Sequence, residues 1–223
     1  VWAFVSYYQR DVKKLVAYLS VSHLGFVMLG IFALNQQGTS GATLQMVNHG
    51  LSTGALFLIV GMLYDRRHTR EMSAYGGIWK VVPYMGALML IVSLSSMGLP
   101  GLNGFIGEFL ILLGSFGSNA IDFGGVASSS YWLVGAATLG VILAAVYLLV
   151  MFERVFLGPV THEENKSLRD LKLREVLLLL PLLVLIFWIG LYPKPFLALI
   201  SPSVEQLVAL VQTASAAAMT TAH

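Results

Sequence analysis

Two ionisable residues are notable because apolar sequence surrounds them. Glu108 lies in the long apolar stretch 82–117, just beyond the helix-breaking run Gly98-Leu-Pro-Gly101. His23 lies about 11 residues into another apolar run, which in a helix is roughly 16 Å deep and near the bilayer midplane. Ionisable groups at such depth are costly and usually mark the path of an ion or a proton. The alternatives are a static ion pair for the carboxylate and an interhelical hydrogen bond for the histidine.

Two further residues could take part in the same proton chemistry. His49 falls in the polar run Gln45-Met-Val-Asn-His-Gly-Leu-Ser52, which we expect to open a second span, and Ser52 shares its helical face. A relay role and a structural cap or interhelical hydrogen bond are equally open for His49. Lys13 begins a predicted helix beside Asp11, where a lysine usually reaches the membrane surface and sets topology.

The segment around Pro100 and Gly101 predicts a broken membrane helix. Proline lacks an amide donor and glycine disfavours helix, so free backbone polar groups are expected there. Discontinuous helices of this kind occur at the binding and translocation sites of transporters. The break therefore places Glu108 close to unwound backbone within the same span.

The overall composition predicts a membrane protein. Hydrophobic residues make up 57% of the chain and charged residues 11%, with a mean hydropathy of +0.79, whereas roughly 25% of residues are charged in soluble domains. The chain has no cysteine, and it lacks the usual phosphate, zinc and dinucleotide motifs. Its basic residues form no continuous stripe, which argues against nucleic acid as a partner. We therefore expect no cofactor, no metal and no redox centre in this chain.

Apolar runs long enough to cross a bilayer, which needs about 20 helical residues, occur at 12–34, 43–64, 82–117, 131–157 and 175–200. Lysine and arginine cluster before the first run, after the second and after the fourth. Such clusters prefer one side of the membrane. All three clusters lie on the same side only if the run 82–117 crosses the membrane once, so we expect it to form a single broken helix. Only Lys194 then lies opposite. The predicted fold is an all-α, polytopic transmembrane helix bundle with one discontinuous helix.

Three regions are expected along the chain. Residues 1–8 form an apolar segment without an initiator methionine, which we interpret as the end of an upstream transmembrane helix. Residues 9–200 form the five-span bundle, and the Ala-rich residues 201–223 form a C-terminal tail that is frayed or interfacial. We expect the sequence to be the C-terminal part of a longer protein.

A set of sequence segments resembles one known family. The segments are Arg10 to Gly25 (RDVKKLVAYLSVSHLG), His49 to Ser52 (HGLS), Leu63 to Arg70 (LYDRRHTR) and Leu99 to Phe109 (LPGLNGFIGEF). Together they resemble the M-type antiporter-like membrane subunit of respiratory complex I, from about Gln9 to Pro195. A glutamate in the Gly-Glu-Phe position is typical of the M-type subunit, whereas its sister subunits carry lysine there.

The resemblance implies a role for each candidate residue. Glu108 would be the terminal proton-exchange carboxylate, His23 and His49 would be histidines of the central axis, and Lys13 would be the basic residue opening the His23 helix. Leu19 stands where the family often has serine or threonine, which removes a polar group near His23. The implied partners are the lipid bilayer, protons and neighbouring antiporter-like subunits. NADH, flavin, iron–sulfur clusters and quinone would belong to partner subunits.

The predicted function is that of a proton-translocating membrane subunit of an NADH:quinone oxidoreductase. The chain would carry the outer-side proton half-channel, coupled to quinone reduction elsewhere. Its expected location is the bacterial inner membrane or an equivalent energy-transducing membrane. Two alternatives stay open: a subunit of a multi-subunit sodium/proton antiporter, and a structural membrane scaffold. Dependence of transport on sodium would distinguish the antiporter subunit from the predicted function. Tolerance of the ionisable residues to replacement would distinguish the structural scaffold.

Overall fold

The computed structural model describes residues 2–116, 118 and 129–221, which are mainly α-helical and contain no β-strand. Residue 1 of the predicted segment 1–8, residue 117 of the predicted third span and the last two residues of the predicted tail lie outside the described residues. The helices are α1 (Trp2–Tyr7), α2 (Val12–Phe32), α3 (Gln36–Arg67), α4 (Pro83–Ser96), α5 (Asn103–Ser115), α6 (Ser129–Phe156), α7 (Leu173–Leu191) and α8 (Lys194–Thr221), with short 3-10 helices η1 (Met72–Ala74), η2 (Ile78–Lys80) and η4 (Glu163–Ser167).

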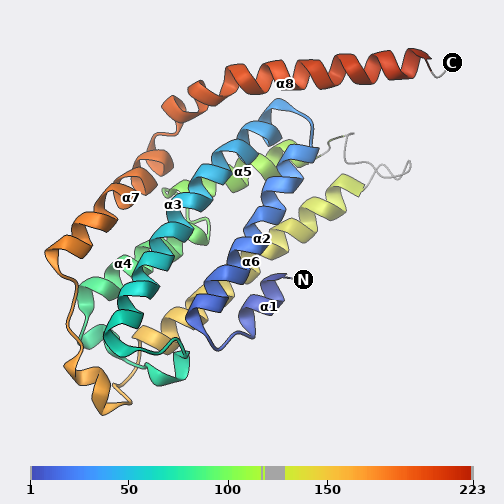
Figure 1. Cartoon of the computed structure of the whole chain (residues 1–223). Helices are drawn as coiled ribbons and strands as arrows, with labels where there is room; N and C mark the ends of the chain where they lie inside the picture. Colours follow the sequence, from blue (N-terminus) through green and yellow to red (C-terminus); the bar gives the residue numbers. More distant parts are fainter. Residues whose placement is uncertain (1, 117, 119–128, 222–223) are drawn as a thin grey trace.

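Most of these helices form one bundle. α2, α3, the α4–α5 pair, α6 and α7 lie alongside one another, with α3 in extensive contact with α2 and α5 (Figure 1). α2, α3, α6, α7 and α8 are each long and apolar enough to cross a membrane by length and composition, and α4 and α5 are shorter apolar helices. The prediction of an all-α transmembrane bundle with one discontinuous helix is confirmed.

The second predicted span, 43–64, is longer at both ends in the structure. α3 begins at Gln36 because the Asn35 side chain caps it, accepting a hydrogen bond from Gly38 N at 2.8 Å. Its first turns are polar, so an apolar window does not detect them. His49 therefore lies well inside the helix, rather than at its opening as we expected from the sequence.

The predicted span 175–200 is divided between two helices. α7 ends at Leu191, and α8 starts at Lys194 and continues through most of the predicted tail. α8 turns away from α7 and lies across one end of the bundle (Figure 1). Gln36 Nε2 donates to Glu205 Oε1 at 2.7 Å, which ties α8 to the start of α3. The chain therefore continues along this end of the bundle after α7.

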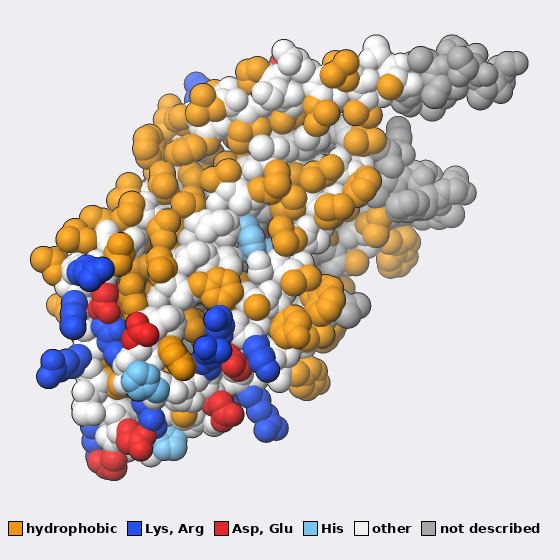
Figure 2. All heavy atoms as spheres, viewed as in Figure 1, with side chains coloured by type: hydrophobic (Ala, Val, Ile, Leu, Met, Phe, Trp, Pro, Cys, Tyr) orange, Lys and Arg blue, Asp and Glu red, His pale blue; other side chains and the backbone are white. Residues whose placement is uncertain are grey.

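Charged side chains gather at the opposite end, and apolar side chains cover much of the visible flank (Figure 2). This charged end consists of the turn before α2 and the connections from α3 to α4 and from α6 to α7. Arg66 pairs with Glu175 at 2.5 Å. Asp170 accepts from Tyr84 N at 2.8 Å and Met85 N at 3.0 Å, and so caps the start of α4. These contacts fix the ends of α3, α4 and α7 relative to one another.

Candidate functional site

The discontinuous helix has a short unwound connection between α4 and α5. Pro100 and Gly101, the residues expected to break the helix, lie in it. Gly98 and Gly101 have φ angles of +73° and +96°, a region that residues with a Cβ rarely adopt. The two glycines therefore let the chain leave α4 and turn into α5 within six residues, 97–102.

A buried hydrogen-bond network joins the helix ends on either side of this connection to α3. Asn48 Nδ2 donates to Asn103 O at 2.7 Å, and Asn103 Nδ2 donates to Asn48 O at 3.3 Å. Asn103 Oδ1 accepts from Ser95 Oγ at 2.5 Å and from Ser52 Oγ at 3.3 Å. All four residues are buried. The network holds both half-helices against α3.

Glu108 contacts His23 within the bundle. Glu108 Oε1 lies 3.0 Å from His23 Nδ1 and accepts from Gln45 Nε2 at 3.4 Å. Glu108 is 4% exposed and His23 is 6% exposed. The second carboxylate oxygen faces Gly98, where an added Cβ would lie 2.5 Å from Oε2. A buried carboxyl–imidazole pair at this distance can hold one proton on either partner.

His49 extends this polar arrangement toward the face of the bundle. Its ring stacks on that of His23, with 5.9 Å between centroids. Its Nε2 lies 2.6 Å from Ser20 Oγ, and its Nδ1 lies 3.2 Å from Thr53 Oγ1. Both ring nitrogens therefore have partners, which fix the orientation of the imidazole. The structure thus brings together three of the predicted site residues: His49, His23 and Glu108.

A small polar cavity of about 10 Å³ lies between the two histidines and the broken helix. Three side-chain atoms of its lining are buried without a hydrogen-bond partner: His23 Nε2, Asn48 Oδ1 and Ser96 Oγ. A site of this size and polarity is suited to about one water molecule. A water bound there would connect His23 to Ser96 in the last turn of α4.

The structure places Lys13 apart from this site. Lys13 is exposed at the start of α2, and ten residues of helix separate it from His23, about 15 Å along the axis. Its neighbour Asp11 caps the helix by accepting from Lys14 N at 3.0 Å. Among the described residues, no group of three or more histidine or acidic side chains could hold a metal ion.

Several residues of the site were not assigned to it from the sequence. Gln45, Asn48 and Ser52 follow the helical spacing i, i+3, i+7, so they form a polar stripe on one face of α3. That stripe is a signal which could have placed Gln45 beside the carboxylate. Ser95 and Asn103 flank the break in sequence, but nothing in their spacing predicts that their side chains meet.

The chain is similar to known membrane proteins of one family. A family described as "NADH:quinone oxidoreductase/Mrp antiporter, TM" matches residues 1–135. NADH-quinone oxidoreductase subunit M from Rhodobacter capsulatus is 44% identical over 206 residues, which are 92% of this chain and 38% of that protein. Subunit M from Mycobacterium tuberculosis is 44% identical over 204 residues, 91% of this chain and 34% of that protein. The chain thus spans well under half the length of these relatives.

Solved structures agree with this similarity. A chain of respiratory complex I from Thermus thermophilus matches with a TM-score of 0.83 and 34% identity, covering 94% of this chain and 42% of that one. A chain of the Mrp complex from Dietzia sp. matches with a TM-score of 0.80 and 17% identity, covering 93% of this chain and 45% of that one, which shows a shared fold. The matches to subunit M from Rhodobacter capsulatus and Mycobacterium tuberculosis confirm the resemblance to the M-type subunit. By the family match over residues 1–135, the chain belongs to the membrane family of the NADH:quinone oxidoreductases and Mrp antiporters.

Proposed function

We propose that this chain forms the outer-side proton half-channel of a proton-translocating membrane subunit of an NADH:quinone oxidoreductase. The observation that carries the proposal is the buried contact of 3.0 Å between Glu108 and His23, beside unwound helix. An ionisable pair within a membrane bundle is costly to maintain and is typical of proton paths. The identity to M subunits over more than 90% of this chain supports the assignment.

In the proposed mechanism, His49 and His23 pass a proton to Glu108. A positive charge arriving on the His49 side disfavours a proton on His23 and so favours its transfer to the carboxylate. Removal of that charge favours return of the proton to His23. The position of the proton is thereby coupled to events elsewhere in the complex. Redox energy would therefore act on this site through electrostatics.

The position of Glu108 in the bundle supports release toward the outer side. α4 starts at the charged end, where Asp170 caps it, and α5, which carries Glu108, continues away from that end. Basic loops of membrane proteins prefer the cytoplasmic side. Glu108 then belongs to the half of the broken helix that leads outward, while Lys13 is a charge at the inner end of α2.

The remaining parts of the reaction belong to other subunits in this proposal. NADH, flavin, iron–sulfur clusters and quinone would bind there, and neighbouring antiporter-like subunits would flank this chain in the bilayer. The proposed location is a bacterial inner membrane or an equivalent energy-transducing membrane, as expected for a family whose matched structures include a respiratory complex. The transported ion in this proposal is H⁺.

The test is Glu108→Gln in the full-length subunit within the assembled complex, reconstituted in vesicles. Protons translocated per electron should fall in this variant, while Glu163→Gln, which changes an exposed carboxylate of η4, should leave the ratio unchanged. Unchanged pumping by an assembled Glu108→Gln complex would contradict the proposal. The same assay without sodium should give the same ratio, and a requirement for sodium would favour the antiporter function.

A further inference from the structure

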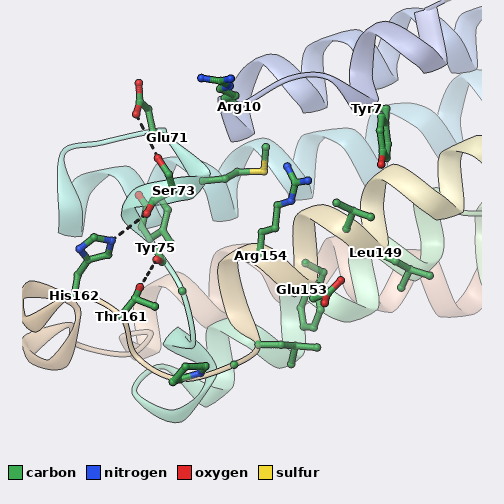
Figure 3. Close-up of a pocket in the computed structure, with 17 residues that line it drawn as sticks. Tyr7, Arg10, Glu71, Ser73, Tyr75, Leu149, Glu153, Arg154, Thr161 and His162 are labelled. Atoms are coloured by element: carbon green, nitrogen blue, oxygen red, sulfur yellow. Dashed lines mark hydrogen bonds between the residues drawn. The ribbon is translucent and has the colours of Figure 1, made fainter.

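A large cavity of about 1280 Å³ lies at the charged end, and neither His23 nor His49 is part of its lining. Its walls are the turn before α2, the segment 71–76, the last turns of α6 and the segment 157–162 (Figure 3). Backbone and side-chain contacts fix these walls: Met72 N donates to Arg10 O at 2.9 Å, and Thr161 Oγ1 donates to Tyr75 O at 3.0 Å. The cavity is therefore a built feature of the fold.

Two arginines line this cavity from different sides. Arg10 lies in the turn before α2, and Arg154 extends from the end of α6 into the space that faces this turn (Figure 3). Both are exposed, and neither forms an ion pair with a carboxylate of the described residues. The hydroxyl-bearing ring of Tyr7 is part of the same lining. Guanidinium groups with free donors match the geometry of a phosphate.

An exposed apolar stripe on α6 leads away from the cavity. Leu139, Ile142, Val146 and Leu149 are exposed and follow the spacing of one helical face. Leu149 lines the large cavity, while Leu139 and Ile142 line a second, mainly apolar cavity of about 620 Å³ between α1, α2 and α6. Polar donors thus lie at the charged end, and an apolar track extends along the helix toward the membrane interior.

We propose that this surface binds one phospholipid molecule, with its phosphate between Arg10 and Arg154 and an acyl chain along the α6 stripe. The ligand must be amphipathic because the two parts of the surface differ in polarity. The arginines lie at the level where headgroups meet the bilayer, since they flank the ends of membrane-spanning helices. Basic pockets between membrane helices on this side are suited to phospholipid headgroups. Free phosphate would use the arginines and leave the stripe unoccupied.

The experiment uses the complete complex in vesicles that contain photoreactive phosphatidylglycerol. After illumination, lipid attached to peptides of α6 and of the segment 71–76 is quantified by mass spectrometry. The variant Arg10→Gln/Arg154→Gln should reduce this labelling about tenfold. The control Arg169→Gln/Arg174→Gln removes two exposed charges from the same end of the bundle, outside the cavity lining, and should leave it unchanged. Equal NADH:quinone activity of both variants shows that they are assembled.

Three results would overturn the proposal. Equal labelling in the two double variants would show that the arginines do not hold the lipid. Displacement of the label by excess inorganic phosphate would indicate an anion site without an acyl-chain site. Absence of labelling in the unmutated complex would show that another helix or subunit covers the groove.

Discussion

His23 Nδ1 and Glu108 Oε1 lie 3.0 Å apart, on α2 and α5, and both side chains are almost fully buried. Gln45 adds a third polar group to the pair, donating to the carboxylate at 3.4 Å. Removal of either partner would leave an ionisable group buried without its main contact, which is strongly unfavourable. Each of these buried groups therefore has the other as its main ionisable contact.

Replacement of Gly98 by alanine, which adds only a methyl group, is expected to lower both stability and proton pumping. Gly98→Ala adds a Cβ at a φ of +73°, 2.5 Å from Glu108 Oε2, so backbone strain and displacement of the carboxylate act together. We expect a loss of about 1–3 kcal/mol in unfolding free energy and reduced proton pumping. Thermal unfolding of the purified subunit and pumping per electron in vesicles measure these effects.

The matched control for this change is Gly61→Ala in α3. An added Cβ at Gly61 meets nothing within 4 Å in the described residues, and alanine favours helix over glycine by up to about 1 kcal/mol. Stability should therefore be unchanged or slightly higher, with normal pumping. Equal losses in both variants would show that the Gly98 effect does not come from its contact with Glu108.

Asn103 is expected to be the main polar attachment of the broken helix. Asn103→Ala removes the acceptor shared by Ser95 and Ser52 and the donor to Asn48 O. Each buried group left without a partner costs about 1–3 kcal/mol, so thermal unfolding should shift clearly downward. Asn165→Ala, a buried asparagine in η4 at the charged end, should also destabilise the protein while pumping per electron is retained. Normal pumping by an assembled Asn103→Ala complex would contradict a positioning role.

Ser20 is expected to orient His49, since its hydroxyl lies 2.6 Å from His49 Nε2. Ser20→Ala removes one ordinary hydrogen bond, worth about 1 kcal/mol, so the pumping rate should fall by less than about tenfold. The comparison is Ser201→Ala in α8, whose hydroxyl donates only within its own helix, to Leu197 O at 2.8 Å. A rate in Ser20→Ala identical to that in Ser201→Ala would rule out this orienting contact.

Much of the fold could be predicted because membrane insertion imposes simple constraints on sequence. Long apolar runs, the break at Gly98 to Gly101 and the basic loops, which lie at one end, together indicate the bundle. The boundaries of helices were harder to predict from the sequence where a helix begins with polar residues or where two helices share one apolar run. The first turns of α3 are polar and capped by Asn35, and the end of α7 at Leu191 is followed by helix α8 within an apolar run.

Glu108, His23 and His49 of the candidate site could be singled out from the sequence, but the geometry of the site could not. Glu108 and His23 are conspicuous because charge is rare within apolar sequence, yet nothing in a separation of 85 positions predicts their contact. Asn103 was missed because its role depends on how a short unwound segment packs on α3. Lys13 was expected among the site residues from a family resemblance, and its exposed position at the end of α2 keeps its contribution a prediction.

The most direct test of the proposed proton path is a double-mutant comparison of protons pumped per electron. His23→Gln, Glu108→Gln and the double variant are each measured in the assembled complex, with quinone reduction as the check on assembly. If the two residues act as one unit, both single variants lower the ratio and the double variant lowers it no further. Independent, additive losses, or a normal ratio in either single variant, would contradict proton transfer through this pair.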